Sequence, residues 1–157
     1  MEYSIRLYRR PNAKPPNTEI VNDILYITKS LTGKWFTANV PDDTLHDLQF
    51  HDVLCLIKQR RTLSFLVFTS WDGMMHITLM ATHPDFQGQG LGSRLIQHFF
   101  RYAQELGFEK VIALTVPEDV NHLYSATIQF YQKHGFVVTK RYTELWERGA
   151  IQLVKRL

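Results

Sequence analysis

Apolar residues recur along this chain either at every second position or at helical spacing, and the change between the two periods divides the chain into predicted elements. Residues 3–9 alternate and predict a first strand. After a proline-rich loop, a helix is predicted with Asn17 as its N-cap and Gly33 as its end. A second, short helix is predicted from Asp42, also as an N-cap. The residues predicted to point inward from these two helices are Ile20, Ile24, Ile27, Leu45 and Leu48.

Three alternating runs follow the short helix, and two tight turns join them. The turns are predicted at Arg60-Arg61 and at Asp72-Gly73, and the Asp-Gly pair is a strong hairpin signal. Strands that are joined by such short turns form an antiparallel meander. The predicted strands cover residues 51–59, 62–70 and 74–82.

A long amphipathic helix comes after the meander and a glycine-rich turn, and Gly107 is a suitable residue to end it. Residues 110–116 then form a largely apolar run of the buried-strand type. A strand, a helix and a strand in this order predict a parallel pair joined by a right-handed crossover. The helix has one apolar stripe, formed by Leu91, Leu95, Phe99, Ala103 and Leu106.

The chain ends with a further helix and two strands. The helix is predicted over about residues 122–133 and is closed by His134-Gly135. The two strands are connected through Glu147-Arg-Gly, and all the elements together predict one α+β domain with a mixed sheet over residues 1–157. The final strands cover residues 136–142 and 150–156.

Composition and charge restrict the classes of protein that fit these elements. Apolar residues make up 45% of the 157 residues and charged residues 21%, as in ordinary globular proteins. The net charge of +3 fits an acidic small molecule, and no long basic run points to nucleic acid. No apolar stretch approaches the roughly 20 residues of a membrane span, so a cytoplasmic protein is expected. Cys55, the single cysteine, lies in an apolar run and is expected to be a buried, inert thiol.

Three glycines at every second position, Gly88, Gly90 and Gly92, form the turn before the long helix. A glycine turn at a helix N-terminus presents uncovered backbone N–H groups and favours a bound anion. The phosphate-loop pattern is absent because no Gly-Lys-Ser or Gly-Lys-Thr occurs, and the third glycine comes one position too early for the dinucleotide fingerprint. The turn therefore predicts an anion site of another kind.

Two motifs narrow this prediction. One is Gln87-x-x-Gly90-x-Gly92, and the other is Phe130-Tyr131-x-x-x-Gly135-Phe136, about forty residues later. With the strand before the turn, they resemble the GNAT superfamily of N-acetyltransferases that use acetyl-coenzyme A, well over residues 50–157 and more loosely before. The resemblance implies a mixed, mostly antiparallel sheet of about seven strands flanked by helices, in which the central parallel pair splays apart.

The resemblance also implies which residues bind the cofactor. The pyrophosphate would lie on the backbone N–H groups of the turn, where Gln87 either supports the turn or binds a phosphate oxygen. The pantetheine arm would pair with the backbone of Met80 and Thr82, and an N–H near Met80 or Ala81 would polarise the thioester carbonyl. The turn residues implied in cofactor binding are Gln87, Gly88, Gln89, Gly90, Leu91, Gly92 and Ser93.

Two positions depart from the family pattern. Many members carry Asn-x-x-Ala before the tyrosine of the last helix, and the asparagine contacts the pantetheine arm. Tyr124 and Thr127 occupy these positions here. We expect Asn121, Tyr124 or Ser125 to replace this contact, unless the contact is absent.

The resemblance aligns Tyr131 with the tyrosine that protonates the departing thiolate, which a phenol can do. The structural alternative places Tyr131 in the core beside Thr127. Two candidates for the general base stay open. His76 begins the fourth strand, where histone-acetylating members have a glutamate, and histidine titrates near neutrality; Glu118 follows the fifth strand. Each of these two can equally be a solvated surface residue, and His83 is expected to be a bystander.

These features predict an enzyme that moves an acetyl group from acetyl-coenzyme A to a primary amine of a small molecule, peptide or protein, by direct nucleophilic attack. Two alternatives stay open: a non-catalytic module that binds or senses coenzyme A, and a toxin-like acetyltransferase acting on aminoacyl-tRNA. Acetyl-coenzyme A and the amine are the expected partners, with no metal and no membrane, and a homodimer is left open.

Overall fold

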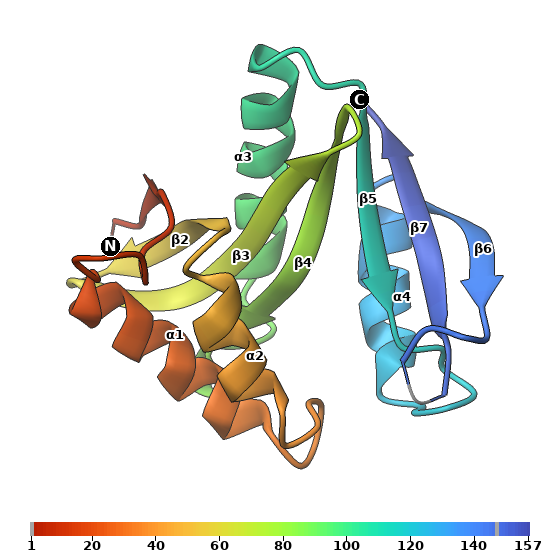
Figure 1. Ribbon diagram of the computed structural model, residues 1–157, viewed down its shortest axis with the longest axis horizontal. Helices are drawn as coiled ribbons and strands as arrows, with labels where there is room; N and C mark the ends of the chain where they lie inside the picture. Colours follow the sequence, from red (N-terminus) through yellow and green to blue (C-terminus); the bar gives the residue numbers. More distant parts are fainter. Residues whose placement is uncertain (1, 147) are drawn as a thin grey trace. The chain divides into compact units, whose positions relative to one another are not determined.

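The computed structural model describes residues 2–146 and 148–157. Its elements follow the predicted order of strands and helices, with one short 3₁₀ helix, η1, added after the meander (Figure 1). Their bounds are β1 Ser4–Tyr8, α1 Thr18–Leu31, α2 Val40–Asp47, β2 Asp52–Lys58, β3 Arg61–Trp71, β4 Met74–Thr82, η1 Pro84–Phe86, α3 Leu91–Glu105, β5 Lys110–Thr115, α4 Tyr124–Lys133, β6 Val137–Tyr142 and β7 Ala150–Arg156.

The seven strands are hydrogen-bonded in the order β1-β2-β3-β4-β5-β7-β6. β4 and β5 run parallel, whereas β1–β2, β2–β3, β5–β7 and β6–β7 are antiparallel. This topology confirms the predicted α+β fold with a mixed, mostly antiparallel sheet. The chain divides into two compact units: unit 1 is Met1–Thr69 with Leu79–Tyr102, and unit 2 is Ser70–Thr78 with Ala103–Leu157.

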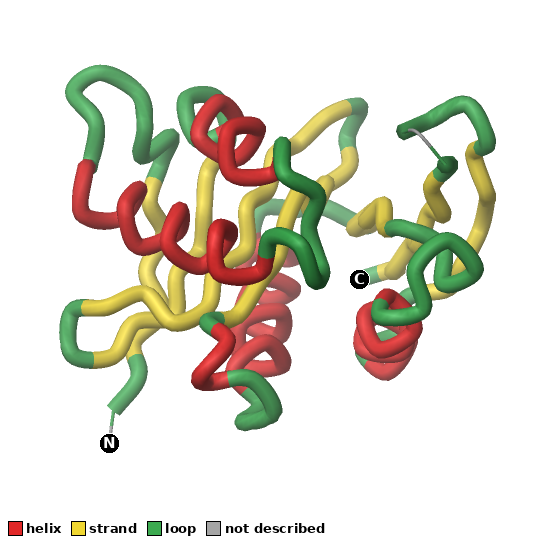
Figure 2. Tube along the Cα trace, turned by 90° about the horizontal axis from the view of Figure 1, so that it is seen from below, coloured by secondary structure: helices red, strands yellow, loops and turns green. Residues whose placement is uncertain are grey.

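In unit 1, α1 and α2 cover one face of the strands and α3 covers the other (Figure 2). The isoleucines of α1 recur at helical spacing, so they point to one side and meet the strand residues that alternate toward that face. They pack against Cys55 and Phe65, which are both fully buried. The core residues of α1 are Ile20, Val21, Ile24, Ile27 and Leu31.

The opposite face of unit 1 is covered by the apolar stripe of α3. The ring of Phe99 lies 5.1 Å from that of Phe68 on β3. The predicted last member of the stripe is wrong, because Leu106 is 54% exposed. The helix ends at Glu105 with bonds from Gly107 N–H to Gln104 O and from Phe108 N–H to Ala103 O, which turn the chain away before Leu106 can pack. The buried stripe is Leu91, Leu95, Phe99 and Ala103.

The start of α2 differs from the prediction. The helix begins at Val40 after Asn39, so Asp42 lies inside the first turn and is not the N-cap. Pro41 explains the earlier start, because proline has the backbone angle of a first helical turn and needs no hydrogen-bond partner there. In this register Leu48 is fully buried as predicted, whereas Leu45 is 36% exposed and was wrongly expected to point inward.

One of the two predicted hairpin turns is shifted by one residue. Gln59 and Arg60 have φ values of 52° and 66°, so they form the turn and Arg61 already belongs to β3. Two successive left-handed residues are typical of the tight turns that match strand twist. The second turn is as predicted, with Asp72 and Gly73 at φ values of 55° and 73°.

Unit 2 contains β5, β7 and β6 with α4, together with the β3–β4 turn and the first half of β4. The helix α4 buries Ile128 and Tyr131, and it ends at His134 and Gly135, as predicted. The predicted connection through Glu147 lies outside the described residues. None of the helices in the described chain combines the length and the apolar character that crossing a membrane requires.

Asp23 anchors α1 to the β2–β3 hairpin. Its side chain is 11% exposed, accepts the Thr62 N–H at 3.0 Å and pairs with Arg61 at 3.3 Å. We expect Asp23→Ala to lower the free energy of unfolding by about 2–3 kcal/mol, because it leaves the buried Thr62 N–H without its acceptor. Arg61→Gln should cost less than about 1 kcal/mol, since Arg61 is 64% exposed. Urea unfolding measures both, and equal losses would contradict this assignment.

Cys55 is fully buried on β2, as predicted. Burial raises the pKa of the Cys55 thiol to about 12, and only the thiolate reacts with disulfide reagents. We expect no measurable modification of the native protein by a water-soluble disulfide reagent at about pH 8, and one thiol per chain after unfolding. Rapid stoichiometric reaction of the native protein would contradict the buried placement.

Candidate functional site

The glycine turn joins the end of β4 to the start of α3. Gly88 and Gly90 have φ values of 77° and 79°, which side-chain-bearing residues rarely adopt. A Cβ added at either glycine would meet no protein atom within 4 Å, so the backbone angle and not internal crowding calls for glycine. The first helical bond runs from Arg94 N–H to Gly90 O at 3.1 Å. Leu91 and Gly92 are therefore the first two residues of α3. Backbone N–H groups at this end of a helix have no acceptor within the helix, and they favour a bound anion.

Side-chain hydrogen bonds hold the end of β4 under this turn. Gln87 Nε2 donates to Thr82 O at 3.3 Å, so Gln87 supports the turn. The hydroxyl of Ser64 on β3 lies 2.9 Å from the Thr82 hydroxyl and donates to Ala81 O at 3.2 Å. Sequence reasoning missed Ser64, because nothing in the local pattern of β3 marks a serine that is fully buried.

His83 helps to shape the turn and was expected to be a bystander. Its Nδ1 accepts the Asp85 N–H at 3.1 Å, which caps η1. The imidazole ring also stacks on Tyr26 of α1, at 5.4 Å between ring centroids, and meets Phe86 edge to face at 5.3 Å. These contacts give His83 a structural role between α1 and the glycine turn.

The backbone positions expected to meet the pantetheine arm lie in the second half of β4. Ala81 is 8% exposed and faces the core with α1, whereas Met80 and Thr82 are partly exposed. This alternation agrees with a strand that has one covered face. The parallel ladder between β4 and β5 comprises three residue pairs, from Met75–Val111 to Ile77–Ala113. Thus β4 continues for several residues past the part of it that pairs with β5.

In unit 2, His76 lies within this ladder, opposite Ile112 of β5. Its ring is 5.9 Å from that of Trp71, which is 73% exposed on the other side of the Asp72-Gly73 turn. The Nε2 atom of His76 is buried and has no hydrogen-bond partner among the described residues. A buried nitrogen in this state costs free energy and often marks a functional position.

Tyr131 lies in the third turn of α4 and is 6% exposed. Its ring packs against Phe136 at 5.0 Å and Phe130 at 5.7 Å between centroids. This burial raises the pKa of Tyr131 above its ordinary value, so the phenol keeps its proton over the whole physiological range. The Phe-Tyr-x-x-x-Gly-Phe motif is thus an aromatic cluster that fixes the tyrosine ring.

The three candidates for the missing asparagine contact differ in what they do, and the Ser125 hydroxyl accepts a hydrogen bond from Gln129 Nε2 at 3.4 Å. Asn121 Oδ1 accepts the Leu123 N–H at 3.1 Å, and its backbone oxygen accepts the Tyr124 N–H at 3.0 Å. This turn explains why α4 begins at Tyr124 and not at 122 as predicted. Burial raises the pKa of Tyr124. The Asn121 oxygen is therefore engaged in a local turn, and Tyr124 is half-buried.

Glu118, the other candidate for the base, lies in the loop after β5. It lines a hollow of about 320 Å³ between this loop, α4, β6 and β7. Neither His76 nor Tyr131 lines this hollow. Its neighbour Asp119 forms a two-pronged ion pair with Arg141, at 3.0 Å for each bond, and the pKa of Asp119 is lowered by this hydrogen bonding.

Comparison with known proteins gives the class of this chain. The family profile described as acetyltransferase (GNAT) domain matches residues 51–138, which include the meander, the glycine turn, α3 and α4. The chain belongs to this GNAT family of acyltransferase enzymes.

Individual relatives agree with this assignment. The chain is 32% identical over 78 residues to the L-amino acid N-acyltransferase MnaT of Escherichia coli K12, an alignment that covers 48% of this chain and 42% of that protein. The chain thus spans less than half the length of this curated relative. The ribosomal-protein-S18-alanine N-acetyltransferase of Escherichia coli has a similar fold, with a TM-score of 0.76 at 14% identity over 99% of this chain and 94% of that one.

A third protein of similar fold has acetyl-CoA bound. It is a GNAT family acetyltransferase from Elizabethkingia anophelis with acetyl-CoA bound, which has a TM-score of 0.69 at 18% identity. The similarity covers 99% of this chain and 98% of that one. At 18% identity, this similarity shows only that the two proteins share a fold.

Proposed function

We propose that this chain is an N-acetyltransferase that moves an acetyl group from acetyl-coenzyme A to a primary amine. The observation that carries the proposal is the turn of Gly88 and Gly90 at the start of α3, held open by left-handed backbone angles and tied to β4 through Gln87. Backbone N–H groups at a helix start bind phosphate oxygens well. Membership of the GNAT family supports the pyrophosphate of coenzyme A as the anion.

The proposed reaction is direct attack of the amine on the thioester. The amine nitrogen forms a bond to the carbonyl carbon, and the bond from carbon to sulfur breaks. The leaving sulfur takes a proton from the Tyr131 hydroxyl, and the attacking nitrogen loses a proton to a base. A backbone N–H near Met80 or Ala81 would stabilise the oxyanion.

His76 is our first choice for the base, and the orphaned Nε2 atom supports it. A neutral imidazole nitrogen that has no protein partner is able to accept a proton from an amine. Glu118 is the second choice, because the hollow that it lines holds neither His76 nor Tyr131.

We propose an α-amino group as the acceptor. The names of two relatives point to α-amines, since they specify L-amino acids and an alanine. An α-amine has a pKa of about 8, whereas a lysine ε-amine has one of about 10.4, so the α-amine needs far less help from a base at neutral pH.

A panel of amines tests the proposed function. Free L-amino acids, short peptides with free N-termini, lysine side chains and polyamines are each mixed with acetyl-coenzyme A and the protein, and thiol release is followed. We expect release that depends on the acceptor and is largest for an α-amine. Tight coenzyme A binding without release on any acceptor would favour the non-catalytic module. Aminoacyl-tRNA, with binding that falls steeply with salt, would favour the toxin-like enzyme.

His76→Gln separates the two acceptor classes. At neutral pH we expect about tenfold slower transfer to an ε-amine but only a few-fold slower transfer to an α-amine, and the difference should shrink near pH 10, where both amines are largely neutral. The measurement is kcat/KM for a matched pair of peptides. His98→Gln, on α3, serves as the control and should leave both values unchanged. Equal losses on both acceptors at every pH would exclude His76 as the base.

A further inference from the structure

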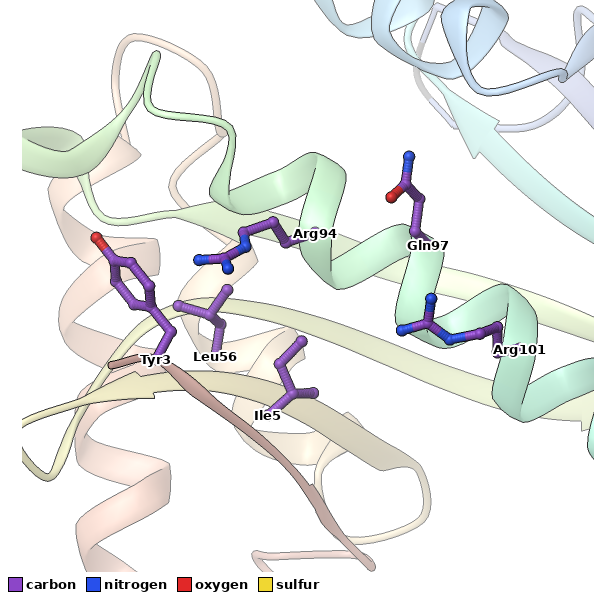
Figure 3. A pocket seen from close by; sticks show the side chains of 6 residues that line it. All are labelled: Tyr3, Ile5, Leu56, Arg94, Gln97 and Arg101. Carbon is purple, nitrogen blue, oxygen red and sulfur yellow. The ribbon is translucent and has the colours of Figure 1, made fainter. Parts of the chain in front are cut away.

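A second hollow lies in unit 1, between β1, β2 and the outer side of α3, with a volume of about 250 Å³ (Figure 3). Its floor is apolar, and its rim carries two arginines from α3 and a tyrosine from the start of the chain. Figure 3 shows the side chain of Arg94 extending toward Tyr3. The lining residues are Tyr3, Ile5, Leu56, Arg94, Gln97 and Arg101.

The positive charges around this hollow have no carboxylate partner within the described part of the chain. The Arg94 guanidinium lies 5.2 Å from the centroid of the Tyr3 ring, and Lys58 Nζ lies 5.5 Å from the same centroid. Among the described residues, no carboxylate forms an ion pair with Lys58, Arg94 or Arg101. The described residues that line the hollow include no acidic side chain. Cations concentrated beside a recess attract an anion, and guanidinium groups bind carboxylate or phosphate with two parallel hydrogen bonds.

The spacing of the two arginines restricts the shape of that anion. Arg94 and Arg101 are seven residues apart, two helical turns, so their Cα atoms are separated by about 10 Å along α3. The apolar side chains of Ile5 and Leu56 form the floor of this hollow. A compact anion reaches one guanidinium. An elongated anion reaches both and buries its apolar middle on the floor.

We propose that this hollow binds a small organic dianion that has an apolar spacer and an acidic group, carboxylate or phosphate, at each end. Arg94 binds one end and Arg101 the other. Tyr3 contacts two cations through its ring and lines the side of the hollow near the start of β1. The site does not depend on the proposed acetyl transfer.

Calorimetric titration with linear dicarboxylates of increasing length tests this site, at about 150 mM salt so that long-range attraction is screened. We expect suberate, which has eight carbons, to bind at least tenfold more tightly than succinate or sulfate. Arg94→Gln and Arg101→Gln should each weaken suberate about tenfold and remove the preference for length. Arg6→Gln is the matched control, because Arg6 follows Ile5 on β1 and points to the opposite face.

The titration can be interpreted whether or not the protein transfers acetyl groups, because no sample contains acetyl-coenzyme A. Equal affinity for suberate, succinate and sulfate would show charge attraction alone and overturn the proposal, as would no binding at all. A loss in Arg6→Gln as large as in Arg94→Gln would show that only net charge matters. An acidic peptide that binds more tightly than every dicarboxylate, through the same arginines, would replace the small-molecule site with a peptide surface. Thermal unfolding of each variant confirms that it is folded.

Discussion

Replacing Gly90 by alanine is expected to weaken coenzyme A binding by about 2–3 kcal/mol, roughly 30- to 150-fold in the dissociation constant. Two effects combine. Alanine is strained at a φ of 79°, and its Cβ would point into a space that is free of protein atoms within 4 Å, where we propose the phosphates bind. Titration of coenzyme A by calorimetry measures the loss.

The same helix supplies a matched control for this variant. Gly107 follows the other end of α3, has a φ of 90°, and likewise has no protein atom within 4 Å of an added Cβ. Gly107→Ala should therefore cost a similar amount of stability, about 1 kcal/mol, and leave coenzyme A affinity unchanged. If the two variants lose the same affinity, or Gly90→Ala loses none, the glycine turn is not the pyrophosphate site.

Replacing Tyr131 by phenylalanine is expected to lower kcat about hundredfold with little change in KM for acetyl-coenzyme A. The variant removes the proposed proton donor but keeps the ring that packs against Phe136. Steady-state rates over a range of pH give a second readout. A phenol must be protonated to donate, and burial raises the pKa of Tyr131, so the wild-type rate should show no decline from this group up to about pH 10.

Tyr102→Phe is the matched control for this substitution. Tyr102 contacts Phe68 from α3, at 5.7 Å between ring centroids, and has no proposed role in the reaction. Loss of the Tyr102 hydroxyl should leave kcat within about twofold of the wild-type value. A Tyr131→Phe variant with equally small effects would mean that another group or water supplies the proton, and that Tyr131 belongs to the core.

The elements of the fold could be predicted because the apolar residues of each element repeat with the spacing of a strand or of a helix. The alternating runs of the meander and the helical stripes of α1 and α3 correspond to buried faces in the structure. The errors lie at the ends of the elements, because the residues that cap a helix determine where it starts and stops. Asp42 was a plausible N-cap, but Pro41 moves the start of α2 to Val40, and the bond pattern around Gly107 leaves Leu106 outside the packed stripe.

The functional residues divide in the same way. The glycine turn is contiguous in sequence, so a turn with free backbone N–H groups could be predicted from the spacing of Gly88, Gly90 and Gly92. The structure adds the left-handed backbone angles of Gly88 and Gly90. The hydrogen bonds of Ser64 and the neighbours of His76 arise from pairing between strands, and no local pattern encodes them. The hollow between β1, β2 and α3 is lined by residues more than ninety positions apart, Tyr3 and Arg101, so only the tertiary structure reveals it.

Mass spectrometry of an α-amine peptide, after incubation with the protein and acetyl-coenzyme A labelled in the acetyl group, tests the proposed acetyl transfer most directly. We expect one labelled acetyl group on the peptide N-terminus, formed at the rate of thiol release, with the protein itself unlabelled because the attack is direct. No labelled acceptor across the amine panel, or label that passes first onto the protein, would contradict it.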